Sequence, residues 1–351
     1  VISFVMPGHA ADVTSQFDTY FTANAIAGVE GFHQEMKDKH ILLVGERHGI
    51  ADNYNLYLAL LHTFTQGHVQ LVLELPPSSA YLLGEYVRSG DTALLQQSIS
   101  LLQGTFGYSQ EHIDFWQQVR QMHLNGRTFE VVGVDQEFQL KSMAFALLQL
   151  DEQTYTPVLA QINEAGKQGV TALMEALASM VKAHEGMEIK DKKDQAIYDI
   201  MISVEQLLDN PTGDKNRDFP LYQTFKRKVN PDFPALGVFG GAHIARATDG
   251  TSMVSMLLKE PSLVDHITTA QLFYMNSSYR EATSGMVSSL NSFTDDSIIV
   301  QHARKQSSDL CIYRLPHDAL FEKEDFSLPA MYDYVMLLFN AKATTPMNKQ
   351  N

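Results

Sequence analysis

The sequence contains one cysteine, Cys311, among 351 residues. A single thiol excludes an internal disulfide and a thiolate metal cluster, and its position in the apolar run LCIYRL indicates a small buried side chain. Long apolar runs are also lacking: a membrane helix needs about 20 apolar residues, whereas the longest candidate, YVMLLF, is strand-sized. We therefore expect no transmembrane segment.

Basic residues are scarce, since 26 Lys and Arg stand against 41 Asp and Glu, for a net charge of −15. A polyanion would meet a repulsive average field, and no local basic cluster offsets it, so we do not expect nucleic acid as a partner. At 44% hydrophobic residues the chain can nevertheless bury a large core. No oligomeric state can be read from the sequence.

The first residues, VISFVMPGHAADV, lack a starting Met and resemble the tail of a signal peptide, with Gly8 and Ala10 before a cleavage point. We interpret residues 1–30 as an N-terminal segment that carries a signal-peptide remnant. This favours an exported protein, periplasmic or secreted, over a cytoplasmic one. The alternative is that residues 1–6 form a short strand.

Short apolar runs alternate with helical patterns along the rest of the chain. The predicted strands are HILLVGE (40–46), VQLVLELPP (69–77), TFEVVGVD (128–135), ALGVFGG (235–241), AQLFYM (271–276), DLCIYRL (309–315) and YDYVMLLF (332–339). Between about 140 and 230 the pattern is helical only. The sequence therefore predicts an α/β fold over residues 31–346: a single domain with a mostly parallel, mixed central sheet flanked by helices, and a helical insertion at about 140–230.

Two segments show neither pattern. PTGDKNRD (211–218) is the strongest turn signal and is expected to return the insertion to the sheet. SGMVSSLNSFTDDS (284–297) is expected to form a loop.

Polar side chains directly follow four of the predicted strands: Glu46 with His48, Glu74, Asp135 and His243. Loops beyond the carboxyl ends of strands in an α/β sheet converge on a ligand crevice, so we expect these side chains to share one neighbourhood. Taken singly, each would more often be a cap or a structural hydrogen-bonding group. Glu74 lies in an apolar strand end, where an unpaired charge is costly, so a His or Arg partner is expected.

Glycines precede both histidines, in GERH (45–48) and GGAH (240–243), where they would allow a sharp backbone turn and the approach of a substrate. This pair of G-x-x-H elements resembles the erythromycin esterase-like, ChaN-like and Tiki superfamily of hydrolases and ligand-binding proteins, over about residues 40–346. FWQQVRQMHLNGRTFEVVGVDQE and NRDFPLYQTF are similar to stretches of the esterases, whereas the short Glu-to-His spacing in GERH is closer to ChaN-like and Tiki-like members.

No Ser or Cys lies in a G-x-S-x-G-type elbow, so we expect an ester, lactone or amide to be hydrolysed by activated water, without a covalent intermediate. His48 is expected to be the general base, with Glu46 or Glu74 orienting its ring. His243 would share the proton transfer, and Arg217 would stabilise the oxyanion.

A small-molecule or peptide substrate would contact Asp135, Arg47 and Arg246. Either no cofactor is required, or Glu46, His48, Glu74 and His243 hold a divalent metal, for which Mn, Co or Zn suits these ligands. The resemblance leaves three alternatives open: a ChaN-like protein that binds haem, iron or a small ligand, a Tiki-like metal-dependent peptidase, and an effector that cleaves a host protein.

Overall fold

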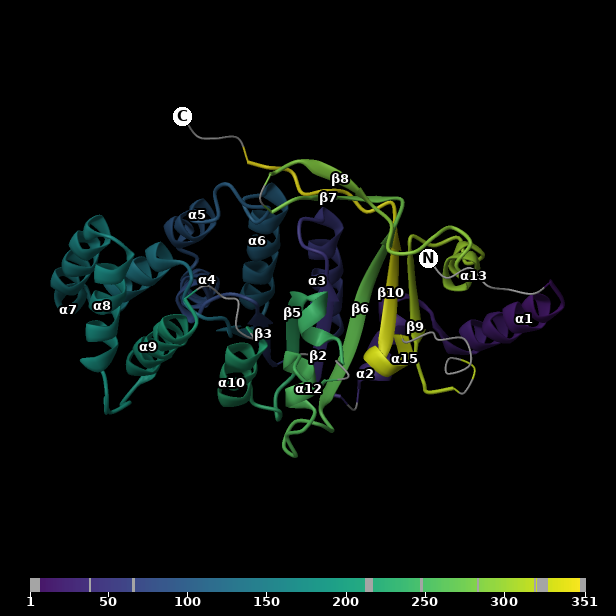
Figure 1. Cartoon of the computed structure of the whole chain (residues 1–351), viewed down its shortest axis with the longest axis horizontal. Coiled ribbons are helices and arrows are strands. Elements are labelled where there is room, and N and C mark those ends of the chain that lie inside the picture. The colour runs from purple at the N-terminus through teal and green to yellow at the C-terminus, as the bar shows by residue number, and fades with distance from the viewer. Residues whose placement is uncertain are drawn as a thin grey trace. The chain divides into compact units, whose positions relative to one another are not determined.

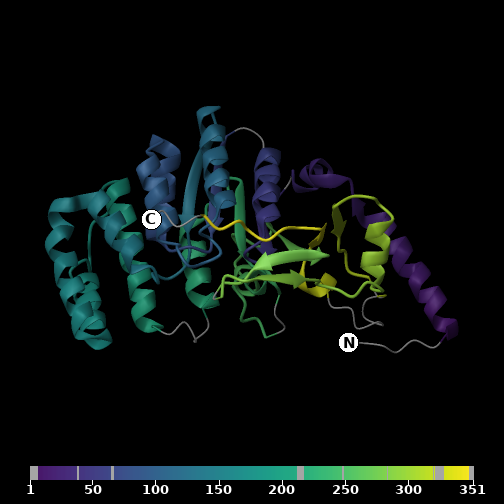
Figure 2. The ribbon, with the colours of Figure 1, turned by 90° about the horizontal axis from the view of Figure 1, so that it is seen from above.

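Figures 1 and 2 show the computed structural model of the chain, which describes residues 7–37, 39–64, 67–211, 217–246, 249–282, 284–318, 320 and 328–347. Residues 1–6 of the expected signal-peptide remnant and residues 212–216 of the expected turn lie outside these ranges. Within them, no helix is both long and apolar enough to cross a membrane.

Eight strands form a mostly parallel, mixed sheet with flanking helices, so the predicted α/β fold is confirmed. The chain divides into two compact units, which we describe one at a time. Unit 1 comprises residues 1–65, 104–111 and 239–351, and unit 2 comprises residues 66–103 and 112–238.

Unit 1 contains the strand order β1-β9-β10-β6-β2. These strands are β1 (Ala25–Ile26), β2 (Ile41–Glu46), β6 (Ile267–Met275), β9 (Leu310–Arg314) and β10 (Tyr334–Phe339). β2, β6 and β10 are parallel, whereas β9 pairs antiparallel with β10 and with β1. Ile41 to Val44 of β2 are at most 1% exposed. A strand buried on both faces gives a continuous apolar run, and this is why β2 was predictable.

The helices of unit 1 in the described ranges are α1 (Pro7–Asn24), α2 (Gly28–Met36), α3 (Ala51–Thr63), α11 (Gly241–Ile244), α12 (Met253–Leu257), α13 (Ile298–Arg304) and α15 (Leu328–Met331). α3 begins five residues after the end of β2, and α11 directly follows β5 (Ala235–Gly240). Both therefore start beside the polar residues that follow their strands.

Unit 2 contains β3 (His68–Leu73), β4 (Thr128–Gly133) and most of β5, in the parallel order β5-β3-β4. Its helices are α4 (Pro77–Ser89), α5 (Thr92–Ser100), most of α6 (Gln110–Leu124), α7 (Leu140–Gln168), α8 (Val170–Lys182), α9 (Lys192–Asp209) and α10 (Asp218–Lys228). α7, α8 and α9 pack in succession, as Figure 1 shows. Residues 140–228 are therefore helical wherever the structure describes them, apart from short connections.

The prediction of a loop at residues 284–297 is wrong in part. β8 (Val287–Leu290) pairs antiparallel with β7 (Ser277–Arg280) in a two-stranded hairpin. Its cross-strand neighbours include Ser278 with Ser289 and Tyr279 with Ser288, and Val287 is 56% exposed. A hairpin without a buried apolar face lacks the alternation by which a strand is recognised in a sequence.

Gly49 ties the loop after β2 to the β7 hairpin and to the C-terminal segment. Its carbonyl accepts hydrogen bonds from the backbone N–H groups of Arg280, at 2.9 Å, and Thr344, at 3.0 Å. Its φ is +84°, and a Cβ at this position would lie 2.2 Å from the Arg280 carbonyl oxygen. Glycine is therefore required here both by conformation and by space.

We predict that Gly49→Ala lowers the free energy of unfolding by about 3 kcal/mol, because backbone strain and a backbone clash add. Gly28→Ala is the matched control: Gly28 has a φ of +65° with nothing within 4 Å, so only the strain of about 1 kcal/mol applies. Denaturant unfolding followed by circular dichroism measures both. Equal losses in the two variants would contradict the close approach at Gly49.

Candidate functional site

The first predicted pair forms in unit 1, where Glu46 ends β2 and His48 follows it. His48 Nδ1 lies 2.5 Å from Glu46 Oε1. The other oxygen, Oε2, accepts hydrogen bonds from Asn53 Nδ2, at 2.6 Å, and from the Tyr57 hydroxyl, both on α3. The carboxylate is thus held from two sides, and it fixes the orientation of the imidazole.

Buried aromatic residues support this pair. The Tyr274 hydroxyl, on β6, donates to Asn53 Oδ1 at 2.9 Å and accepts from the Arg47 backbone N–H at 3.4 Å. Burial, and then the nearby Glu46 charge, raise the pKa of Tyr274 well above its ordinary value, so the hydroxyl stays a donor. The His48 ring stacks on Phe106, with centroids 4.9 Å apart and planes at 8°. The side chain of His48 remains 37% exposed, against 11% for Glu46.

Close packing explains the glycines that precede the two histidines. His243 lies on α11, which packs against β2. A Cβ on Gly45 would lie 2.3 Å from Gln271 Oε1, and one on Gly241 would lie 2.7 Å from Gln271 Nε2. Neither glycine has a positive φ, so the backbone conformation alone does not require glycine at these two positions. They are glycines because the buried Gln271 side chain leaves no room for a Cβ.

The second predicted cluster forms in unit 2, around Arg217 at the start of α10. Arg217 Nη1 lies 2.8 Å from Glu74 Oε1, its Nε donates to Asp135 Oδ1 at 3.2 Å, and its Nη2 bonds the other Asp135 oxygen. The Asp135 side chain is fully buried and that of Glu74 is 10% exposed. The expected cationic partner of Glu74 is therefore Arg217.

Burial and charge pull the pKa values of this cluster in opposite directions. Burial raises the pKa of Asp135 above its ordinary value, although the Arg217 guanidinium works against this. Burial alone would lower the pKa of Arg217, but Asp135 and Glu74 together raise it. Arg217 therefore stays charged between the two acidic side chains.

A further carboxyl, Glu137, was missed by the sequence analysis. It is fully buried two residues after Asp135, beside the Ser78 hydroxyl and the backbone N–H groups of Ser78 and Gln139. Burial raises the pKa of Glu137 to about 8, so the carboxyl is neutral at pH 7. The only signal was an acidic residue in VDQEF, which by itself does not distinguish a buried carboxyl from an exposed one.

The remaining predicted residues have other contacts. Arg246 Nη2 lies 2.5 Å from Asp333 Oδ1, and Asp333 also accepts hydrogen bonds from the backbone and hydroxyl of Thr269, each at 2.9 Å. The Arg47 guanidinium lies over the Tyr279 ring, 4.4 Å from its centroid. Arg246 therefore joins the end of α11 to the start of β10, and Arg47 packs on the β7 hairpin.

The residues predicted as one site thus fall into two sets, one in each unit. Glu46, His48 and His243 belong to unit 1, whereas Glu74, Asp135 and Arg217 belong to unit 2. The convergence of the two sets stays a prediction. Within the described part of the chain, no three His, Cys, Asp or Glu side chains are grouped so that they could hold a metal ion.

In comparisons with protein families and with curated proteins, the sequence finds no match. A protein from Bacillus cereus matches in structure with a TM-score of 0.68 at 13% identity, covering 95% of this chain and 99% of its own. A succinoglycan biosynthesis protein matches with a TM-score of 0.65 at 10% identity, covering 96% and 99%. ChaN of Campylobacter jejuni, solved with cofacial heme binding, reaches a TM-score of 0.37 at 11% identity, covering 88% and 91%. The first two show a shared fold along nearly the whole chain.

We predict that Arg217→Gln lowers the free energy of unfolding by about 3 kcal/mol, because Glu74 and Asp135 lose their counter-charge while buried. Arg88→Gln serves as the control: its pair with Glu85 is exposed, with Arg88 at 67%, so the loss should stay under about 1 kcal/mol. Urea unfolding at pH 7 measures both. A loss no larger than that of the control would show that the buried cluster does not need the guanidinium.

We predict that the free energy of unfolding depends on pH because of the raised pKa of Glu137. The folded state keeps the proton up to about pH 8, whereas the ordinary pKa is 4.5, so unfolding releases a proton between these values and stability falls as the pH rises through them. Glu137→Gln should remove this decline and be more stable than the wild type at pH 8.5 by a few kcal/mol. Thermal unfolding from pH 4.5 to 8.5 tests this, with Glu130→Gln, 49% exposed, as the control.

Proposed function

We propose that the protein is a hydrolase that cleaves an ester, lactone or amide bond with water activated by His48. The Glu46–His48 pair carries this proposal. A carboxylate bound to Nδ1 fixes the neutral tautomer with its proton on that nitrogen, and it stabilises the imidazolium that forms when Nε2 accepts a proton. The same arrangement of base and orienting carboxylate serves hydrolases of unrelated folds.

The chemical step follows from this arrangement. Water attacks the carbonyl carbon of the substrate while its proton passes to His48 Nε2, and the imidazolium then protonates the leaving group. No covalent bond forms between the enzyme and the substrate. Asn53 and Tyr57 both donate hydrogen bonds to the second oxygen of Glu46, and these bonds hold the carboxylate in position against the imidazole.

The contacts of Arg217 favour a positioning role. Its guanidinium bonds both Glu74 and Asp135, so its Nε and both Nη groups already have carboxyl partners. Such a cluster holds Glu74 in place more readily than it attracts an oxyanion. We therefore assign Arg217 to the positioning of Glu74, and keep Glu74 and His243 as the remaining catalytic candidates.

The bonds within the first pair favour a base over a metal site. Glu46 Oε1 and His48 Nδ1 bond each other, and Glu46 Oε2 accepts hydrogen bonds from two residues of α3, so three atoms that could bind a metal already have hydrogen-bond partners. A catalytic zinc needs three protein ligands around an open position. Membership of the erythromycin esterase-like, ChaN-like and Tiki superfamily is part of the proposal. It rests on the paired G-x-x-H elements, and the α/β fold is compatible with it.

The test is turnover of a panel of p-nitrophenyl esters, lactones and peptides by the full chain, with and without EDTA. We expect turnover that survives EDTA and falls by about 10²-fold or more in His48→Gln and in Glu46→Gln. His62→Gln, an exposed histidine on α3, is the matched control and should keep full activity. Circular dichroism establishes equal folding of all variants.

Other outcomes contradict the proposal in distinguishable ways. Turnover abolished by EDTA and restored by Mn, Co or Zn would replace the base mechanism with a metal site. Equal turnover in His48→Gln and the wild type would remove His48 from the mechanism. No turnover of any substrate, together with a haem absorption band after the protein is mixed with haem, would favour a binding protein.

A further inference from the structure

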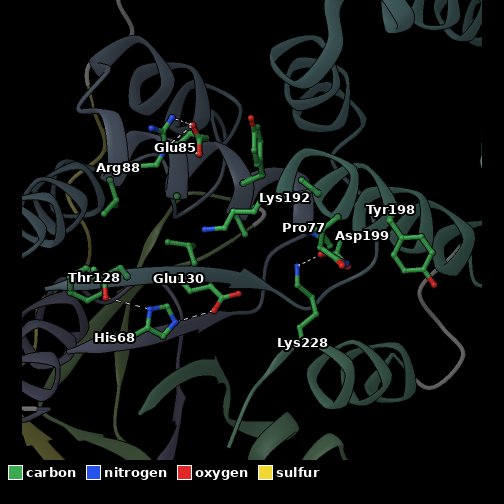
Figure 3. A pocket seen from close by; sticks show the side chains of 18 of the residues that line it. His68, Pro77, Glu85, Arg88, Thr128, Glu130, Lys192, Tyr198, Asp199 and Lys228 are labelled. Carbon is green, nitrogen blue, oxygen red and sulfur yellow. Dashed lines mark hydrogen bonds and ion pairs between the residues drawn. The ribbon is translucent and has the colours of Figure 1, made fainter. Parts of the chain in front are cut away.

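Unit 2 contains a cavity of about 1110 Å³ that none of the predicted site residues line (Figure 3). It is bounded by α4, by the first four residues of β4, by the beginning of α9 and by the last turn of α10. Glu74 and Asp135 instead follow the carboxyl ends of β3 and β4. The cavity therefore extends toward the opposite ends of these strands.

The charge balance of its lining is the reverse of that of the whole protein. Four Lys and Arg side chains line the cavity, against three Asp and Glu, whereas acidic residues clearly outnumber basic ones in the chain. Two of the acidic groups have partners at one end: Glu85 pairs with Arg88, and Glu130 lies 3.2 Å from the His68 ring. The surplus of positive charge therefore lies at the other end, around Asp199.

Two cations, Arg227 and Lys228, pair with the single carboxylate of Asp199. Its side chain is 5% exposed, with Lys228 Nζ 2.8 Å from Oδ2 and Arg227 Nη2 3.2 Å from Oδ1. Gln195 Nε2 donates to the same carboxylate at 3.2 Å. One cation would suffice to neutralise a buried carboxylate, so the second leaves a net positive charge. Arg227 also lies over the Tyr198 ring, which restrains its guanidinium.

Lys192 adds a further positive charge. It begins α9, lines the cavity and forms no ion pair with any described residue. Figure 3 shows its side chain projecting into the space between Glu85 and Glu130, while Lys228 reaches Asp199 through the dashed ion pair. The rest of the lining includes apolar side chains such as Ala80, Val131 and Ile189. The cavity thus offers an apolar wall beside a cationic end.

The geometry points to a binding site for an amphipathic organic anion, with its carboxylate or phosphate against Arg227 and Lys228 at the Asp199 end and its ring or chain against α4 and β4. A volume of this size suits a small molecule rather than a single ion. Arg and Lys bind both phosphate and carboxylate groups. Probes that carry one or the other group show which of them the site prefers. The site is independent of the proposed hydrolysis.

The experiment measures binding of phenyl phosphate, phenylacetate and 2-phenylethanol to the full chain by isothermal titration calorimetry. We expect at least one anion to bind about tenfold more tightly than the neutral alcohol, and its affinity to fall as salt rises. Arg227→Gln should weaken it about tenfold, the loss of one charged hydrogen bond, and Lys192→Gln, which removes a lining charge farther from Asp199, should weaken it by a smaller factor. In Arg227→Gln the buried Asp199 keeps Lys228, so the fold is preserved.

Two further variants complete the test. Lys167→Gln removes the same charge from an exposed side chain on α7, 63% exposed, and should leave the affinity unchanged. Ala196→Phe places a ring in the cavity from α9 and should block every probe. Binding of the alcohol as tight as that of the anions, affinities unaltered by Lys192→Gln and Arg227→Gln, or no binding of either anion at millimolar concentration would each overturn the assignment.

Discussion

Unit 2 depends on the bond of one guanidinium to two buried carboxylates. β3 and β4 are parallel, with Leu73 beside Gly133, so the acidic residues that follow them emerge next to each other. A Cβ on Gly133 would lie 2.5 Å from the Pro76 carbonyl oxygen, so the glycine lets the chain after Glu74 pass close to β4. A negative charge on a buried carboxyl is costly without a cation, and Arg217 stabilises the arrangement by joining both strand ends to α10.

Unit 1 also holds a carboxylate at the end of a buried strand, but with different partners. Glu46 also follows a buried parallel strand, but its partners are an amide, a phenol and an imidazole rather than a guanidinium. An imidazole can gain and lose a proton near neutral pH, whereas a guanidinium cannot. The carboxylate after β2 is therefore suited to proton transfer, and the carboxylates after β3 and β4 are suited to holding a fixed charge.

Basic residues of this acidic protein lie at both ends of α10 in unit 2. Arg217 begins α10, while Arg227 and Lys228 end it. One helix thus supplies the cation for the strand-end carboxylates at one end and the surplus around Asp199 at the other. The helical segment, for which the sequence suggested no role, provides both.

The sequence by itself determined seven of the eight strands of the sheet, because strands buried on both faces, such as β2, appear as continuous apolar runs; it missed the two-residue β1 and the β7–β8 hairpin. It also determined which polar residues follow the strands, and it predicted a cationic partner for Glu74 because an unpaired charge in an apolar strand end is costly. Only the tertiary structure decided the pairings: Arg217 with two acids, Tyr57 with Glu46, and Gln271 against two glycines. These contacts join segments that are far apart in the chain. Local patterns of hydrophobicity and spacing therefore do not predict which distant side chains will be in contact.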